Sequence, residues 1–269
     1  MKDLFKIRKN YIILCFVCLF FLFSNFRIVK SQDLFNQYLS SYSKYKSDRE
    51  SFLISLDNFL AYKSLSSEAE AIEKAKKMIS SKLELVEIYL KFLGNKLSLE
   101  AKGDESLKNQ IYSEIENKIG EIALLKDELE SYRTLSGLNK FDQDFKGKYA
   151  SVELLSFKTL AFLGFSKFSN FINILSGEID ILEKYAKEAE TKDQKKNFLL
   201  EERTNKLKDS FGLIKTKSEE NFNKFSNEIN LNNSKEVYFH YLDSLESLRL
   251  ELDQFILSFE ETTELIKNL

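Results

Sequence analysis

The sequence contains no proline and no tryptophan, and only eight of its 269 residues are glycine. Proline breaks helix interiors and glycine weakens them, so a chain with so little of either can form long helices. The same scarcity removes the tight turns on which all-β and α/β folds depend. The composition therefore predicts an all-α protein.

Residues that bind metals or act as nucleophiles are also scarce. Cys15 and Cys18 are the only cysteines, and His240 is the only histidine. A single histidine excludes H-E-x-x-H zinc sites and every site built on two histidines. His240 lies in an aromatic stretch at 238–241, and no residue spacing supplies it with a catalytic partner. We predict neither a metal nor a cofactor.

Motifs for phosphate binding and acyl transfer are missing from the sequence, because its glycines occur singly. Acidic residues are numerous, but they are interleaved with lysines between apolar positions, the pattern of a solvated helix face. General acid–base catalysis needs two carboxyl groups held in one cleft, and this pattern does not indicate such a pair. The sequence therefore predicts a protein that is not an enzyme.

The N-terminus has the pattern of an export signal. Four of its first ten residues are basic and one is acidic, and the run Tyr11–Phe23 is apolar without a charge or a glycine. Val29 and Ser31 stand at −3 and −1 of a cleavage before Gln32, which suits a signal peptidase that requires small residues there. We predict that residues 1–31 form a signal peptide and that the protein is periplasmic, surface-located or secreted.

An uncleaved anchor is the alternative for this segment. It would hold the body of the protein outside the cytoplasm on a single membrane-spanning helix. Such a helix needs ~20 apolar residues, and the run Tyr11–Phe23 is shorter than that. Its length therefore favours cleavage.

Apolar residues recur at alternating steps of three and four along the following chain, which predicts helices packed through apolar seams. We expect three long helices, the last ending near Gly137, to form an antiparallel bundle over residues 32–137. The first seam contains Phe35, Tyr38, Tyr42, Tyr45, Arg49, Phe52, Leu56 and Phe59. The second contains Ile72, Ile79, Leu83, Val86, Leu90, Leu93 and Leu97, and the third Ile111, Ile115, Lys118, Ile122, Leu125, Leu129 and Tyr132.

A second helical bundle is expected over residues 151–269, packed on the first or continuous with it. The stretch 138–150 is polar with a glycine near its end, so we predict a linker there. The pattern over residues 178–230 fits either one helix or two. The last helix repeats the regular spacing of the first, through Tyr238, Tyr241, Leu245, Leu248, Leu252, Phe255, Phe259, Thr262 and Ile266.

Residues 152–182 are apolar around most of a helical wheel, which predicts a helix buried among several others. Insertion of this stretch into a membrane is the alternative. Lys158 and Lys167 interrupt the stretch and argue against insertion.

Helical seams without recognisable chemistry predict an interaction or scaffold protein of the cell envelope or surface. It would bind protein partners through helix faces or associate with itself through its seams. The acidic residues outnumber the basic ones after residue 31, which disfavours nucleic acid as a partner. Two alternatives are a membrane-tethered periplasmic coiled-coil spacer and a carrier of an apolar ligand. The candidate contact residues are Tyr38, Tyr42 and Tyr45 for a partner, and Phe162, Phe165 and Phe168 for a ligand between helices.

Overall fold

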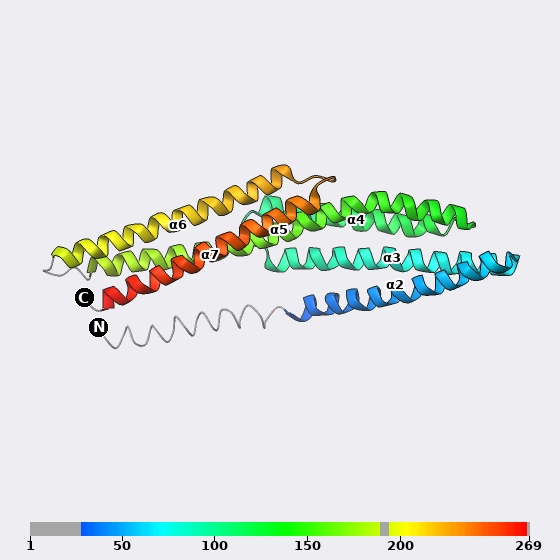
Figure 1. Ribbon diagram of the computed structural model, residues 1–269, viewed down its shortest axis with the longest axis horizontal. Coiled ribbons are helices and arrows are strands. Elements are labelled where there is room, and N and C mark those ends of the chain that lie inside the picture. Colours follow the sequence, from blue (N-terminus) through cyan, green and yellow to red (C-terminus); the bar gives the residue numbers. More distant parts are fainter. Residues whose placement is uncertain (1–27, 189–193, 268–269) are drawn as a thin grey trace. The chain divides into compact units, whose positions relative to one another are not determined.

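The computed structural model describes residues 28–188 and 194–267, which form six helices and no strand (Figure 1). This confirms the predicted all-α fold. Of the stretch 178–230, residues 178–188 lie in one helix and residues 194–228 in another. The helices are α2 (Ile28–Tyr62), α3 (Leu65–Glu100), α4 (Glu105–Leu129), α5 (Leu135–Glu188), α6 (Gln194–Glu228) and α7 (Ser234–Lys267).

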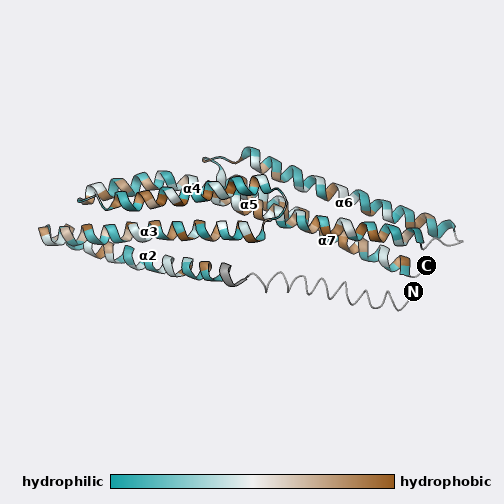
Figure 2. Cartoon of the chain, turned by 180° about the vertical axis from the view of Figure 1, so that it is seen from behind, coloured by the Kyte–Doolittle hydropathy of each residue, from teal (hydrophilic) through white to brown (hydrophobic). Residues whose placement is uncertain are grey.

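The apolar run Tyr11–Phe23, with both cysteines, lies outside the described residues. Within the described ranges no helix combines the length and the apolar character needed to cross a membrane. This finding includes the stretch 152–182, for which membrane insertion was the alternative. Figure 2 shows that polar residues are interspersed with apolar ones along the helices.

The chain divides into two compact units, and each unit is built from two stretches of sequence. Unit 1 contains the chain up to Leu99 together with Tyr112–Gly147. Unit 2 contains Glu100–Ile111 together with Lys148–Leu269. Because two of these divisions fall inside helices, α4 and α5 each contribute one part to each unit.

The expected linker at 138–150 is helical and forms part of α5. Leu138, Phe141 and Phe145 follow the spacing of a helix face and are buried in unit 1, which explains the difference. The polar residues between them had masked this face in the composition. Gly147 does not interrupt the helix, since a single glycine costs only ~1 kcal/mol in a helix interior.

The third predicted helix ends earlier than expected, at Leu129 instead of near Gly137. Tyr132 therefore lies in the turn between α4 and α5. Thr134 is the N-cap of α5, because its Oγ1 accepts a hydrogen bond from the Gly137 backbone N–H at 3.1 Å. This cap places Gly137 inside the first turn of α5.

Two other turns are fixed by short polar side chains. Ser64 and Ser67 form a reciprocal cap at the start of α3. Each hydroxyl accepts a hydrogen bond from the other residue's backbone N–H, at 3.1 and 3.2 Å. Between α3 and α4, Gly103 adopts a left-handed conformation with φ of 107°. Asp104 then caps α4 by accepting a hydrogen bond from the Leu107 backbone N–H at 2.9 Å.

The core of unit 1 is largely aliphatic. Its most deeply buried members follow the predicted heptad spacing of α3, as Ile79, Leu83, Leu90, Leu93 and Leu97. Ile115 and Leu129 of α4 and Leu138 of α5 are buried in the same unit. Ile72, which was expected on this seam, is only half-buried.

The core of unit 2 combines aliphatic residues with a cluster of aromatic rings from α5, α6 and α7. Phe162 of α5 is 1% exposed and its ring lies 6.1 Å from that of Phe222 on α6. Phe225 of α6 and Tyr241 of α7 belong to the same cluster, with ring centroids 4.9 Å apart. Most of the stretch 152–182 is buried or half-buried, as its composition predicted, but Ile174 and Ile181 are exposed near its end.

Candidate interaction surface

Helix α2 packs on α3 with a face that contains small polar residues. Ser41, Asp48 and Ser55 are seven residues apart and are the buried residues of α2 within the range 32–62. Half-buried aromatic side chains lie three or four residues from these positions: Tyr38, Tyr45, Phe52 and Phe59. Small side chains at the closest positions allow two helices to approach, and the larger rings lie beside the line of contact.

Two aromatic pairs join the first part of α2 to α3. The rings of Tyr38 and Tyr89 have centroids 5.7 Å apart, and those of Phe35 and Phe92 are 5.9 Å apart. Tyr38 therefore contacts α3, and Tyr45 lies on the same half-buried face of α2. Of the three tyrosines predicted to meet a partner, only Tyr42 is exposed.

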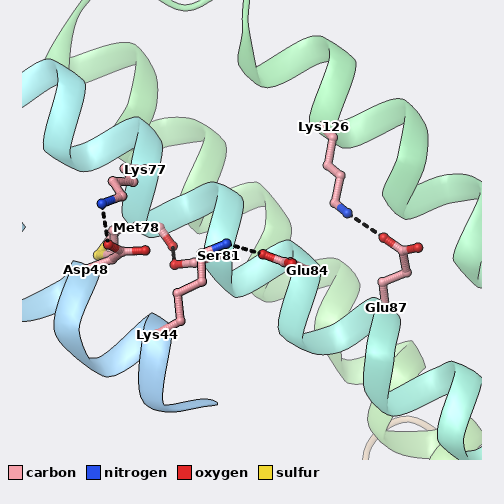
Figure 3. A network of polar contacts seen from close by, with 8 residues as sticks. All are labelled: Lys44, Asp48, Lys77, Met78, Ser81, Glu84, Glu87 and Lys126. Atoms are coloured by element: carbon pink, nitrogen blue, oxygen red, sulfur yellow. Dashed lines mark hydrogen bonds and ion pairs between the residues drawn. The ribbon is translucent and has the colours of Figure 1, made fainter. Parts of the chain in front are cut away.

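Ion pairs add to the α2–α3 contact, as Figure 3 shows. Lys44 of α2 donates to Glu84 Oε2 of α3 at 2.6 Å. Asp48 Oδ1 of α2 lies 3.2 Å from Lys77 Nζ of α3. Asp48 Oδ2 is buried and has no hydrogen-bond partner among the residues that the structure describes. An unsatisfied buried oxygen is unfavourable, so this helix is held less strongly than an aliphatic seam would hold it.

Two carboxyl groups of unit 1 are stabilised in their charged forms. Glu87 of α3 accepts hydrogen bonds from Lys126 of α4 and from Lys91 (the Lys126 contact is drawn in Figure 3). Burial raises the pKa of Glu87, but the two ammonium groups outweigh burial and leave this pKa below its ordinary value.

Asp142 of α5 has the same kind of environment. Its Oδ1 accepts a hydrogen bond from Lys82 Nζ at 2.7 Å, and Lys146 Nζ lies 3.3 Å from Oδ2. Burial raises the pKa of Asp142, and the two lysines together lower it below its ordinary value. Lys82 also lies 5.1 Å from the centre of the Phe145 ring.

Unit 1 is therefore expected to lose stability in acid. A carboxyl group with a lowered folded-state pKa stabilises the fold above its unfolded pKa, about 3.9 for Asp and 4.3 for Glu. That contribution disappears as the pH falls through the lower folded pKa. We expect the free energy of unfolding, measured by urea titration, to decrease from about pH 5 downwards. Glu87→Gln combined with Asp142→Asn should flatten this decrease.

The control for this prediction is Glu219→Gln, on an exposed position of α6. It should leave the pH dependence of the parent protein unchanged. An equally steep decrease in the double variant would show that these two carboxyl groups do not cause the acid sensitivity.

The three phenylalanines predicted to contact a ligand are engaged with other side chains. Phe165 stacks on Phe222 with ring centroids 4.2 Å apart and an angle of 4° between the ring planes. Phe162 contacts the same ring, and Phe168 is half-buried against the core of unit 2. This packing supplies protein contacts where the carrier hypothesis needs a ligand.

Groups associated with catalysis or metal binding are dispersed. The described part of the chain holds no group of three His, Cys, Asp or Glu residues that could bind a metal ion. His240 is exposed on α7, and its Nε2 lies 3.8 Å from Glu236 Oε1. An exposed histidine with one loosely placed carboxylate is not arranged for acid–base catalysis.

The predicted cleavage site lies at the beginning of α2. This helix starts at Ile28, so the backbone at Ser31 and Gln32 is helical. Cleavage at this position stays a prediction.

A second row of residues on α2 faces solvent beside the packed face. It follows the same steps of three and four, offset by one residue from Ser41 and Asp48. Its apolar members are between 43% and 58% exposed. We call this row the α2 stripe: Leu39, Tyr42, Lys46, Arg49, Leu53 and Leu60.

The sequence-based seam combined members of both rows. It placed Tyr42 and Arg49, which belong to the α2 stripe, on the packed face, and it omitted Ser41, Asp48 and Ser55. Small polar residues do not stand out in an apolar pattern, which explains the error. The signal that was available is that α2 carries two rows of residues with helical spacing.

No family model, curated protein or solved structure matches the chain. The surface chemistry of the helices is therefore the basis for a functional proposal.

Proposed function

We propose that the protein is an exported, non-enzymatic interaction protein of the cell envelope or surface that binds protein partners through the α2 stripe. The α2 stripe is the observation that carries the proposal. Exposed apolar residues scattered singly are normal on protein surfaces. Here they recur along one side of a single helix, beside a face that is already packed.

The composition of the α2 stripe resembles that of protein interfaces. Aromatic residues and arginine are enriched in interfaces, and an apolar centre supplies most of the binding energy. Tyr42 and Arg49 provide these residue types, and Leu39 and Leu53 provide apolar area on either side. A partner helix could dock along such a row through residues spaced by three and four.

The export part of the proposal is supported by the N-terminal sequence pattern. A basic start, a short apolar run and small residues before Gln32 are the features of a cleaved signal. The body that would be exported has no cysteine, so it does not depend on disulfide formation.

A charge placed in the α2 stripe is expected to abolish partner binding while the fold is retained. Leu39→Glu should weaken binding at least about tenfold, because it buries an unpaired carboxylate in the docked state. The measurement is photo-crosslinking in intact cells from a crosslinker placed at Tyr42, with adducts compared between parent and variant.

Export is tested by mass spectrometry of the protein purified from separate cell fractions. The exported chain should have the mass of a chain that starts at Gln32.

The matched control is Leu213→Glu, because Leu213 is an exposed leucine of α6. It should leave the adducts unchanged. Equal loss of adducts in both variants, or none in either, would contradict a role for the α2 stripe. A cytoplasmic chain that keeps its first residues would contradict export.

A further inference from the structure

Helix α7 carries a second exposed row of apolar residues, in unit 2. Its apolar members are between 38% and 60% exposed and follow helical spacing. Acidic residues on the same side of the helix separate them. We call this row the α7 stripe: Phe239, Leu242, Asp243, Glu246, Leu250, Asp253 and Leu257.

The charges of the two stripes are opposite. Lys46 and Arg49 lie in the middle of the α2 stripe, are exposed, and have no ion-pair partner among the described residues. The α7 stripe contains three carboxylates. Glu246 Oε1 accepts a hydrogen bond from Arg249 Nη2 at 2.6 Å within α7, which leaves its second oxygen available. Opposite charges within two apolar rows give complementary surfaces.

The spacing of the stripes matches as well as their charge. If the helices run parallel with Arg49 opposite Glu246, Lys46 faces Asp243, and the leucines at 53 and 60 face those at 250 and 257. If they run antiparallel with the same central pair, Leu53 faces Leu242, but Lys46 then faces Arg249. The parallel direction is the one that places both basic residues of the α2 stripe opposite acids of the α7 stripe.

Pairing of each stripe with itself is unfavourable. Two α2 stripes packed antiparallel about their centres would bring Lys46 and Arg49 of one helix against the same residues of the other. Two α7 stripes would similarly bring carboxylates together. Like charges placed opposite each other in an interface are repulsive, which selects the mixed pair.

We propose that the partner of the α2 stripe is a second copy of this chain, which presents its α7 stripe. The inference rests on the proposed function and names the partner for the same surface. A contact between two different surfaces is heterologous, so each chain offers one stripe of each kind to its neighbours. Such an assembly closes into a ring or extends as a chain, depending on the rotation between copies.

The test is sedimentation velocity on the protein in the form in which the producing cell processes it. The parent protein should associate as its concentration is raised about a hundredfold, and added salt should weaken the association. Arg49→Glu and Glu246→Arg should each weaken association at least about tenfold, since each places like charges opposite each other. An equimolar mixture of the two variants should associate again, because both contacts in the mixed assembly are then between opposite charges.

The control variant is Lys215→Glu, an exposed charge reversal on α6 outside both stripes. It should associate like the parent. A parent protein that is monomeric at every concentration would overturn the inference, as would a mixture of variants that fails to associate. Binding of acidic vesicles through the α2 stripe by a monomeric chain would overturn it too. If the chain is monomeric and Leu39→Glu still removes the cellular adducts, self-association fails and the proposed function stands.

Discussion

Phe162→Ala is expected to lower the free energy of unfolding by about 3–5 kcal/mol. The Phe162 side chain is almost fully enclosed, with the Phe222 ring of α6 as a direct neighbour. Its removal takes a large apolar surface out of the core and leaves a cavity that the surrounding helices fill only in part. The measurement is urea unfolding followed by far-ultraviolet circular dichroism, which reports on the helices of both units.

The control is Phe198→Ala on α6, a residue that is 68% exposed and lies outside both stripes. It should change the free energy of unfolding by no more than about 0.5 kcal/mol. If Phe162→Ala costs as little as the control, the aromatic cluster of unit 2 is not the tightly packed core that the ring distances indicate. That result would also strengthen the alternative of a ligand pocket beside this helix.

Ser166→Ala is expected to cost about 2 kcal/mol, a large effect for the loss of one oxygen atom. Ser166 of α5 is buried, and its hydroxyl makes two hydrogen bonds to the backbone of Lys102. It donates to the Lys102 carbonyl and accepts from the Lys102 N–H, both at 2.5 Å. Each lost backbone hydrogen bond contributes about 1 kcal/mol, and this turn follows α3 without regular helical bonds.

The matched control is Ser156→Ala, another buried serine of the same helix. Its hydroxyl donates to the Val152 carbonyl at 2.7 Å, one turn earlier in α5. A helical carbonyl already accepts a backbone hydrogen bond, so alanine should cost about 0.5 kcal/mol or less at this position. Equal costs at both positions, measured by urea unfolding, would show that Ser166 does not hold the turn after α3 to α5.

The helices of unit 2 could be predicted from sequence because their seams are made of large apolar residues. The predicted seam of α7 is buried or half-buried along its whole length. In α6 the residues with the same spacing, Leu200, Leu207, Phe211, Ile214, Phe222 and Phe225, are buried as well. Large aliphatic and aromatic residues at steps of three and four admit only one face to the core, so the pattern is unambiguous.

Helix α2 and the start of α5 show where the same reasoning fails. On α2, Ser41, Asp48 and Ser55 occupy buried positions that an apolar pattern would assign to larger residues. At the start of α5, polar residues outnumber the buried ones, and the stretch 138–150 resembled a linker as a result. In both places a minority of residues makes the tertiary contacts that decide the structure. The average composition of the stretch does not reveal these residues.

The candidate site could be predicted only in part for the same reason. Tyr42 was expected to meet a partner, and its exposure is compatible with that role. Tyr38 and Tyr45 have the same residue type and nearly the same spacing, yet Tyr38 contacts Tyr89 of α3 and Tyr45 is half-buried. Tyr42 differs in direction from Tyr38 and Tyr45 by about one residue position around the helix. Sequence spacing alone does not distinguish the two directions. The α7 stripe contains acidic residues between its apolar ones, and nothing in the sequence pattern distinguishes it from an ordinary solvated face.

The sharing of α4 and α5 between the units limits how this protein can be rearranged by genetic recombination. A gene fragment ending at residue 147 would carry residues 100–111, which belong to unit 2, and would leave the rest of unit 2 without them. A fragment boundary at 111 or 147 would also divide a helix in its interior. No single contiguous fragment of the gene therefore encodes one complete unit without part of the other.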